Sequence, residues 1–291
     1  MREFSSPPET RPLGSEIDPE LQPFVRELSG EQVRIIEQSR QSVSSLMKEY
    51  GYDSLPIERS KVGVLTQEGF EVLKIDVIGA YDFGRREIYV HERVLDNNLR
   101  TALVVGHEYI HQITEDAYEG KESLLPWRAL NEGVVADLER ELFFGYLRNN
   151  PLYGSDMRRT DETRVQMGDN IMRQELRERA LTPDEIFLLR KIPIPGDDRT
   201  FALDILHFSH KDARNAVRLL WEKMSSGKSD YDQVRRTFIA AVPRRKFSEL
   251  KKIVDSKFGD GFFEKLQKVA GNEKKTLEFA NKLPPSTDFR T

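Results

Sequence analysis

The sequence contains no cysteine. This absence excludes disulfide bonds, thiolate nucleophiles and cysteine-ligated metal sites, so any metal ion would have to be held by His, Asp or Glu. Histidine is also scarce, with 5 among 291 residues. Few histidine motifs are therefore expected by chance in this chain.

Long apolar runs and a strong charge imbalance are absent as well. No stretch approaches the roughly 18 consecutive apolar residues that would indicate a membrane span. The N-terminal sequence MREFSSPPETRPLGSEIDPEL has charges and prolines where a secretory signal needs an apolar core. The 45 basic and 49 acidic residues leave a net charge of only -4, which provides no overall field for nucleic acid or an anionic membrane. We therefore expect a cytoplasmic protein with neither partner, whose oligomeric state the composition does not predict.

The order of sequence patterns predicts an α+β protein with three parts. Residues 1–25 are rich in proline and polar residues and predict an extended N-terminal arm. Residues 26–116 predict a helix and then a small mixed sheet, because KVGVLTQ, EVLKIDVIGAY and REIYVHERV are rich in strand-forming residues. Residues 117–291 predict a wholly helical subdomain, with ALDILHFSHKDARNAVRLLWEKM as its clearest amphipathic stretch.

A helix with one buried face is predicted from Leu99 to about Asp116, because its apolar positions recur at three- and four-residue intervals. This helix contains His107-Glu108-Tyr109-Ile110-His111, an HExxH motif. Residues four apart lie about 40° apart around a helix axis, so both imidazoles can bind one ion. Glu108 lies near the same rim, where a carboxylate can act as a general base toward metal-activated water without being a ligand.

A catalytic zinc site needs a third protein ligand and one open position. The next predicted helix, from about Pro126 to Tyr146, contains LNEGVVADLERELFF. Glu132 and Glu139 share a face of this helix, whereas Asp137 is rotated by about 140° from Glu132. The two glutamates are separated by about 10 Å along the axis, so only one could coordinate. We expect Glu132 to be the ligand. The alternative is a solvent-exposed carboxylate that only stabilises the start of the helix through the helix dipole.

HEYIHQ followed by LNEGVVADLE resembles the gluzincin metallopeptidases, particularly those with an HExxH motif and a downstream NEGxA signature. The resemblance covers about residues 75–145. It implies a zincin-like fold, a peptide or protein substrate and one Zn²⁺ per chain. By the same resemblance His107, His111 and Glu132 would be the metal ligands and Glu108 the general base.

The segment GAYDFGRREIYV is similar to the Gly-Ala-x-Glu-Asn segment that lines the substrate cleft in the aminopeptidase branch. Asp82 and Phe83 replace the Glu and Asn of that segment, so endopeptidase and aminopeptidase remain open. The resemblance also suggests that the strand REIYVH is an edge along which an extended substrate adds.

Gluzincins often use a Tyr, His or Arg of the C-terminal part to stabilise the oxyanion. The candidates here are Tyr153, His207 and His210, although each also fits a turn or a helix flank. Tyr153 and His207 are retained as candidate catalytic residues.

The function predicted is zinc-dependent peptide-bond hydrolysis, and two alternatives stay open. One is a catalytically inactive zincin-like scaffold or peptide-binding protein. The other is an interaction protein in which HExxH is a coincidence; a pattern of two histidines four residues apart with Asp or Glu after the first would arise in only about one random chain of this composition in seventy. The basic cluster at residues 244–246 lacks interleaved aromatics and is interpreted as a solvated helix flank.

Overall fold

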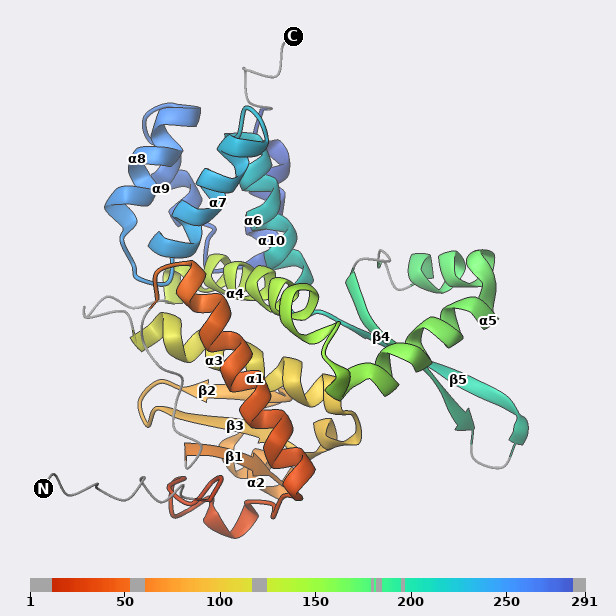
Figure 1. Cartoon of the computed structure of the whole chain (residues 1–291). Coiled ribbons are helices and arrows are strands. Elements are labelled where there is room, and N and C mark those ends of the chain that lie inside the picture. The colour runs from red at the N-terminus through yellow and green to blue at the C-terminus, as the bar shows by residue number, and fades with distance from the viewer. Residues whose placement is uncertain are drawn as a thin grey trace, which may run out of the picture.

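The computed structural model describes residues 12–52, 61–116, 125–178, 181, 185–194 and 197–284. It has the α+β architecture expected from the sequence. A small sheet and its covering helices form one end of the molecule, a bundle of helices forms the other, and an arm projects from the side (Figure 1).

The N-terminal sheet is mixed, as predicted. Its strands are β1 (Val62–Leu65), β2 (Gly79–Asp82) and β3 (Glu87–His91), arranged in the order β1-β3-β2. β3 pairs in parallel with β1 and antiparallel with β2. The prediction that REIYVH forms an edge is therefore wrong, because this segment is the central strand. β2 is the edge on that side, and none of the other described strands pairs with it.

The described end of the predicted N-terminal arm is packed rather than extended. Ile17 and Leu21 are buried in a small apolar cluster with Leu65 and two aromatic residues. The backbone N–H of Arg26 donates to Val64 O at 2.8 Å, so this segment also covers the outer edge of β1. The apolar side chains explain the difference, because they bury surface that an extended arm would expose. The segment up to residue 11 lies outside the described residues.

Three helices hold the sheet and the motif together: α1 (Gly30–Glu49), α3 (Asn98–Asp116) and α4 (Arg128–Leu142). α1 begins with a capping box between Ser29 and Gln32. At Gly106 of α3, a Cβ atom would lie 2.5 Å from Leu142 Cδ2 and 3.1 Å from Ser39 Oγ. The missing side chain therefore allows α3 to approach both neighbouring helices closely. The short α2 (Gln67–Leu73) connects β1 to β2.

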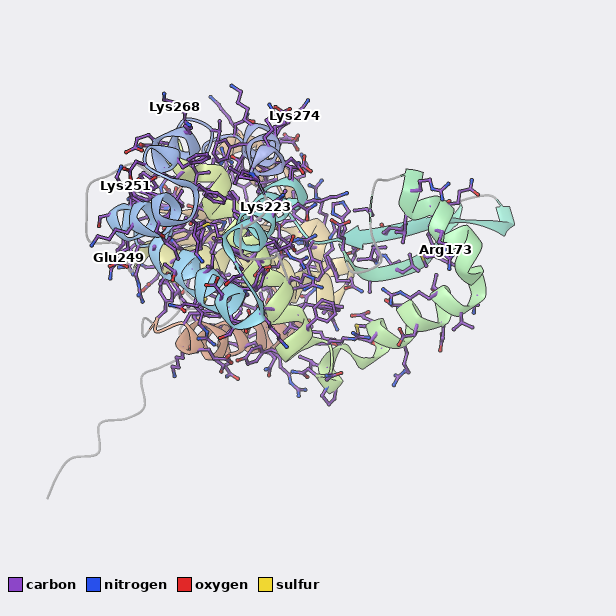
Figure 2. The ribbon with its side chains drawn as sticks, turned by 90° about the horizontal axis from the view of Figure 1, so that it is seen from above. Arg173, Lys223, Glu249, Lys251, Lys268 and Lys274 are labelled. Carbon is purple, nitrogen blue, oxygen red and sulfur yellow. The ribbon has the colours of Figure 1, made fainter. Side chains whose placement is uncertain are left out.

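The arm consists of α5 (Gly154–Glu178), β4 (Ile186–Ile194) and β5 (Asp197–His207), and Figures 1 and 2 show it standing clear of the body. β4 and β5 form an antiparallel hairpin. The prediction of a wholly helical C-terminal part is therefore wrong for this hairpin. Leu203 and Ile205 are two residues apart and pack in one cluster with α5, which is strand periodicity. The helical interpretation merged this strand with the helix that follows it.

The helical bundle contains α6 (Lys211–Met224), α7 (Lys228–Ala241), α8 (Phe247–Phe258), α9 (Phe262–Gln267) and α10 (Glu273–Lys282). α4 packs on α6 at Gly133, where a Cβ would collide with the backbone carbonyl of Ala213. α4 is continued by a π-helix, Phe143–Leu147, and short 3-10 helices occur at Gln22–Phe24, Glu92–Asp96, Leu125–Trp127 and Pro151–Tyr153. Within the described part of the chain, the helices are too short or too polar to cross a bilayer.

The basic cluster at residues 244–246 is partly structural, contrary to the interpretation as a solvated flank. Arg245 forms a buried ion pair with Glu115 of α3 at 2.7 Å. The guanidinium of Arg244 lies 4.1 Å from the centre of the Tyr52 ring. Both contacts join the helical bundle to the N-terminal part.

Candidate metal centre

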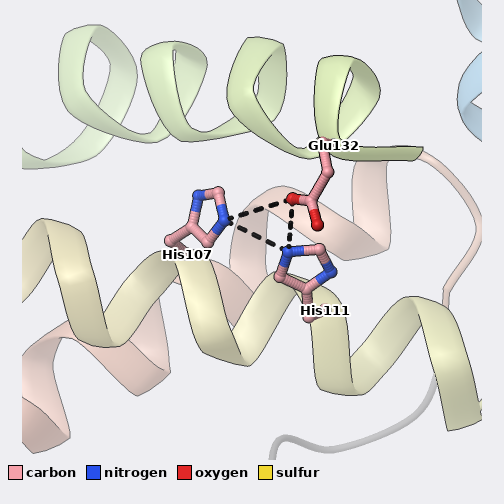
Figure 3. A group of neighbouring side chains, drawn as sticks. All are labelled: His107, His111 and Glu132. Atoms are coloured by element: carbon pink, nitrogen blue, oxygen red, sulfur yellow. Dashed lines mark hydrogen bonds and ion pairs between the residues drawn. The ribbon is translucent and has the colours of Figure 1, made fainter. Parts of the chain in front are cut away.

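Helices α3 and α4 bring together three side chains of the kinds that bind metal ions. His107 and His111 project from successive turns of α3, and Glu132 projects from the first turns of α4 (Figure 3). His111 Nε2 lies 3.1 Å from His107 Nε2 and 3.1 Å from Glu132 Oε2. His107 Nε2 and Glu132 Oε2 are 3.9 Å apart. The structure thus brings together the three residues that the sequence singled out as metal ligands.

The spacing of these three atoms fits a small divalent ion. Ligand atoms about 2.0–2.2 Å from a tetrahedral zinc ion lie about 3.3 Å from one another, and the three observed distances lie on either side of this value. Among the described residues, only these three form a group of His, Asp or Glu ligand atoms within 4.8 Å of one another. The donor set therefore suits a zinc ion with a position left open.

Glu139 contacts His107 from the opposite side of the imidazole ring. Its Oε2 atom is 3.3 Å from His107 Nδ1 and accepts a hydrogen bond from Ser209 Oγ at 2.6 Å. An N–H at Nδ1 leaves the lone pair of Nε2 facing the other two ligand atoms. Burial raises the pKa of Glu139, but His107 and Ser209 outweigh this effect and hold it below its usual value. As expected, only one of the two glutamates lies with the imidazole Nε2 atoms: Glu132 is in the ligand group, and Glu139 contacts His107 on its Nδ1 side.

Glu108 is buried beside the edge strand of the sheet. A Cβ on Gly79 of β2 would lie 2.8 Å from Glu108 Oε1, so the glycine leaves space for the carboxylate. Burial raises the pKa of Glu108, while His107 and His111 oppose the shift. The carboxylate therefore takes up a proton more readily than an ordinary exposed glutamate.

The side chains at the site shift one another's pKa values strongly. Burial lowers the pKa of His111, but the neighbouring Glu132 carboxylate outweighs it and raises the value to about 9. Burial raises the pKa of Glu132, but His111 outweighs it and holds the value far below its usual range. Asp137, the weaker ligand candidate, is directed elsewhere and forms an ion pair with Arg235 at 2.7 Å.

His210 is the oxyanion candidate that the structure brings to the site. Its Nε2 atom is 3.4 Å from Glu132 Oε2, and its ring stacks on that of His107 with centroids 5.6 Å apart. Its Nδ1 atom is 2.8 Å from Glu273 Oε1 of α10. Burial lowers the pKa of His210, but Glu273 and Glu132 raise it above its usual value. In the sequence, recognition of the β4–β5 hairpin would have favoured His210 as the candidate, because this residue follows shortly after the end of β5.

Tyr153 and His207 are not brought to the site. The Tyr153 ring is fully buried in the main core, and its hydroxyl has no hydrogen-bond partner among the described residues. Burial raises its pKa. The His207 side chain is exposed at the end of β5, with Nδ1 2.9 Å from Phe208 O. Neither residue contacts the three ligand-type side chains.

Sequence reasoning missed Ser209, which lies 70 residues from Glu139 and 102 from His107. No spacing rule links a lone serine to residues so distant in the chain.

Comparisons with protein-family models, curated proteins and solved structures find no match for this chain.

Proposed function

We propose that this chain is a zinc-dependent peptidase with a zincin-like site, in which His107, His111 and Glu132 hold one Zn²⁺. The convergence of their three ligand atoms within 4.8 Å of one another is the observation that carries the proposal. A zinc ion bound there would polarise a substrate carbonyl and lower the pKa of water. Sites with four protein ligands are structural, whereas an open position is typical of catalysis.

Glu108 is the general base of the proposed reaction. Its carboxylate follows His107 directly in α3 and is not a member of the ligand group. Its raised pKa suits a residue that takes a proton from the attacking water and returns it to the leaving amine.

His210 replaces Tyr153 and His207 as the proposed oxyanion donor. Glu273 orients its ring through Nδ1, and Nε2 lies on the side of Glu132. The raised pKa favours the form in which both ring nitrogens carry a proton, so Nε2 can donate while Nδ1 stays bonded to Glu273.

The substrate backbone is proposed to pair with β2 instead of β3. The His91 N–H donates to Ile78 O, and the register then points the N–H and C=O groups of Gly79 and Tyr81 away from β3. Gly79 adjoins Glu108, so a strand added there would pass the general base.

The side chain of Asp82 supports cleavage within a chain. Its Oδ1 atom accepts a hydrogen bond from the Arg85 N–H at 3.0 Å, and Oδ2 is 3.3 Å from the Arg85 guanidinium. Asp82 stands where the aminopeptidases have the glutamate that binds the free amine of the substrate. Its carboxylate is instead bonded to Arg85 within a turn. We propose that the substrate is an internal segment of a peptide or protein.

Metal content and hydrolysis of an unfolded protein such as casein test this function. We expect about one zinc per chain in the wild type and in Glu108→Gln, and loss of zinc in Glu132→Ala. Hydrolysis should fall by about 10²–10⁴-fold in Glu108→Gln because only the base is removed. Glu249→Gln is the control, since Glu249 lies on the surface of α8 in the bundle (Figure 2) and should change neither.

The same measurements distinguish the alternatives. Bound zinc without hydrolysis in the wild type would favour an inactive scaffold or a peptide-binding protein. A wild-type protein that takes up no divalent metal after reconstitution would contradict the proposed site and favour the interaction protein.

A further inference from the structure

Ser209 comes to the candidate metal centre from a segment that follows the arm. This segment, Phe208–His210, connects the end of β5 to the start of α6. The N–H of Phe208 donates to Glu185 O at 3.1 Å, and the Phe208 ring is buried against Phe143 with centroids 5.5 Å apart. These contacts fix the backbone on which Ser209 stands.

The Ser209 hydroxyl closes a small network around His107. Its Oγ atom donates to Glu139 Oε2 at 2.6 Å and lies 3.2 Å from His107 Nδ1. The direct distance from His107 Nδ1 to Glu139 Oε2 is 3.3 Å, which is long for a hydrogen bond. The hydroxyl therefore makes the shorter of these two contacts with the Glu139 carboxylate.

We propose that Ser209 is a positioning residue for the metal centre, holding Glu139 so that His107 presents Nε2 to the ion. This inference rests on the proposed metal site. The Ser209 hydroxyl touches neither Nε2 nor Glu132, so it acts through Glu139 and Nδ1 alone. Groups in this position typically change metal affinity by about 10–100-fold when removed. The segment next to the arm therefore contributes to metal affinity.

Zinc affinity, measured by competition with a chromophoric chelator, tests the role of Ser209. We expect Ser209→Ala to weaken Zn²⁺ binding about tenfold or more. Ser209→Thr keeps the hydroxyl and should recover most of the affinity. Ser225→Ala is the control, because Ser225 is a buried serine whose hydroxyl donates to the Trp221 carbonyl, away from the three ligand-type side chains.

A thermodynamic cycle with Glu139 separates positioning from general destabilisation. In a Glu139→Ala background, Ser209→Ala should weaken zinc binding much less than in the wild type, because the carboxylate that it positions is gone and only its 3.2 Å contact with His107 Nδ1 remains. The unfolding temperature of the metal-free protein should be the same for Ser209→Ala and wild type. Affinity losses that add fully in the double variant would overturn the proposal, as would unchanged zinc binding in Ser209→Ala.

These outcomes differ from failure of the proposed function. If wild-type protein binds no zinc, the metal site itself is refuted. If wild-type protein binds zinc and Ser209→Ala binds it equally well, only the role of Ser209 is refuted.

Discussion

Single residues in this molecule show that the same side-chain type serves different purposes according to its contacts. His91 ends the central strand and has both ring nitrogens satisfied. Its Nε2 lies 2.8 Å from Gln67 Oε1, and its Nδ1 accepts the N–H of Arg93 at 3.1 Å. These two roles need a neutral ring, because a protonated Nδ1 could not accept. Burial lowers the pKa of His91, which is consistent with a structural histidine.

This neutral histidine predicts an acid-sensitive N-terminal part. The folded pKa of His91 is lowered, so the unfolded chain binds the proton first as the pH falls through about 6.5. The neutral His91 ring therefore stabilises the fold fully above that pH. This stabilisation is lost as the pH falls further toward the pKa of His91 in the folded protein. We expect His91→Gln to reduce the pH dependence of the free energy of unfolding, measured in urea between these limits. An identical slope in His91→Gln and wild type would contradict this role.

Elements of secondary structure place the proposed substrate edge beside Glu108, the proposed general base. The N-terminal segment covers the outer edge of β1, and β2 forms the opposite edge next to α3. Two exposed apolar side chains, Val77 and Phe83, flank β2. No other described strand pairs along the outer edge of β2. Such an edge, bounded by apolar surface, is suited to an extended peptide.

Proline at position 81 tests pairing along β2. The Tyr81 N–H points away from β3, so Tyr81→Pro removes a donor from the outer edge of β2 and leaves the β2–β3 ladder bonded. Tyr81→Ala is the matched control, since it loses the same ring and keeps the N–H. We expect hydrolysis by Tyr81→Pro to be about tenfold slower than by Tyr81→Ala, the effect of one hydrogen bond of about 1.4 kcal/mol. Equal rates in two zinc-loaded variants would place the substrate elsewhere.

For the whole molecule, polar contacts tie the N-terminal part to the helical bundle. Arg235 of α7 reaches Asp137 and Glu141 of α4 and also the hydroxyl of Tyr50, which follows α1. The carboxylate of Asp137 is buried. A single guanidinium therefore joins three segments that are far apart in the chain.

Removal of this guanidinium should destabilise the whole fold. Arg235→Met would leave the buried Asp137 charge without its partner, at a cost of about 3–5 kcal/mol in the free energy of unfolding. Urea denaturation of the metal-free protein measures this cost. The neighbouring Arg236→Met is the control, because Arg236 is exposed and contacts the backbone carbonyl of Glu49 and the Tyr50 ring instead of a buried carboxylate. A loss below about 1 kcal/mol would show that the junction is held by apolar packing instead.

Local sequence patterns predicted the two helices that carry the candidate metal ligands. The helix carrying His107 and His111 and the following helix carrying Glu132 were both expected. Strand order was not predictable in the same way: β3 is the strand richest in the expected signals, yet it lies in the centre of the sheet. The hairpin of the arm was missed because one apolar run covers both a strand and the next helix.

The sequence by itself determined the chemistry available to this protein. Without cysteine, and with an HExxH motif on a helix, it specified two imidazoles on one face and a carboxylate beside them, since 3.6 residues per turn settles such spacing locally. Tertiary structure decided which other groups lie near them or at the sheet edge: His210 instead of Tyr153 or His207, Ser209 behind Glu139, and β2 instead of β3 as the edge. These choices depend on how α3, α4 and the arm pack, and packing is set by contacts between residues far apart in the chain.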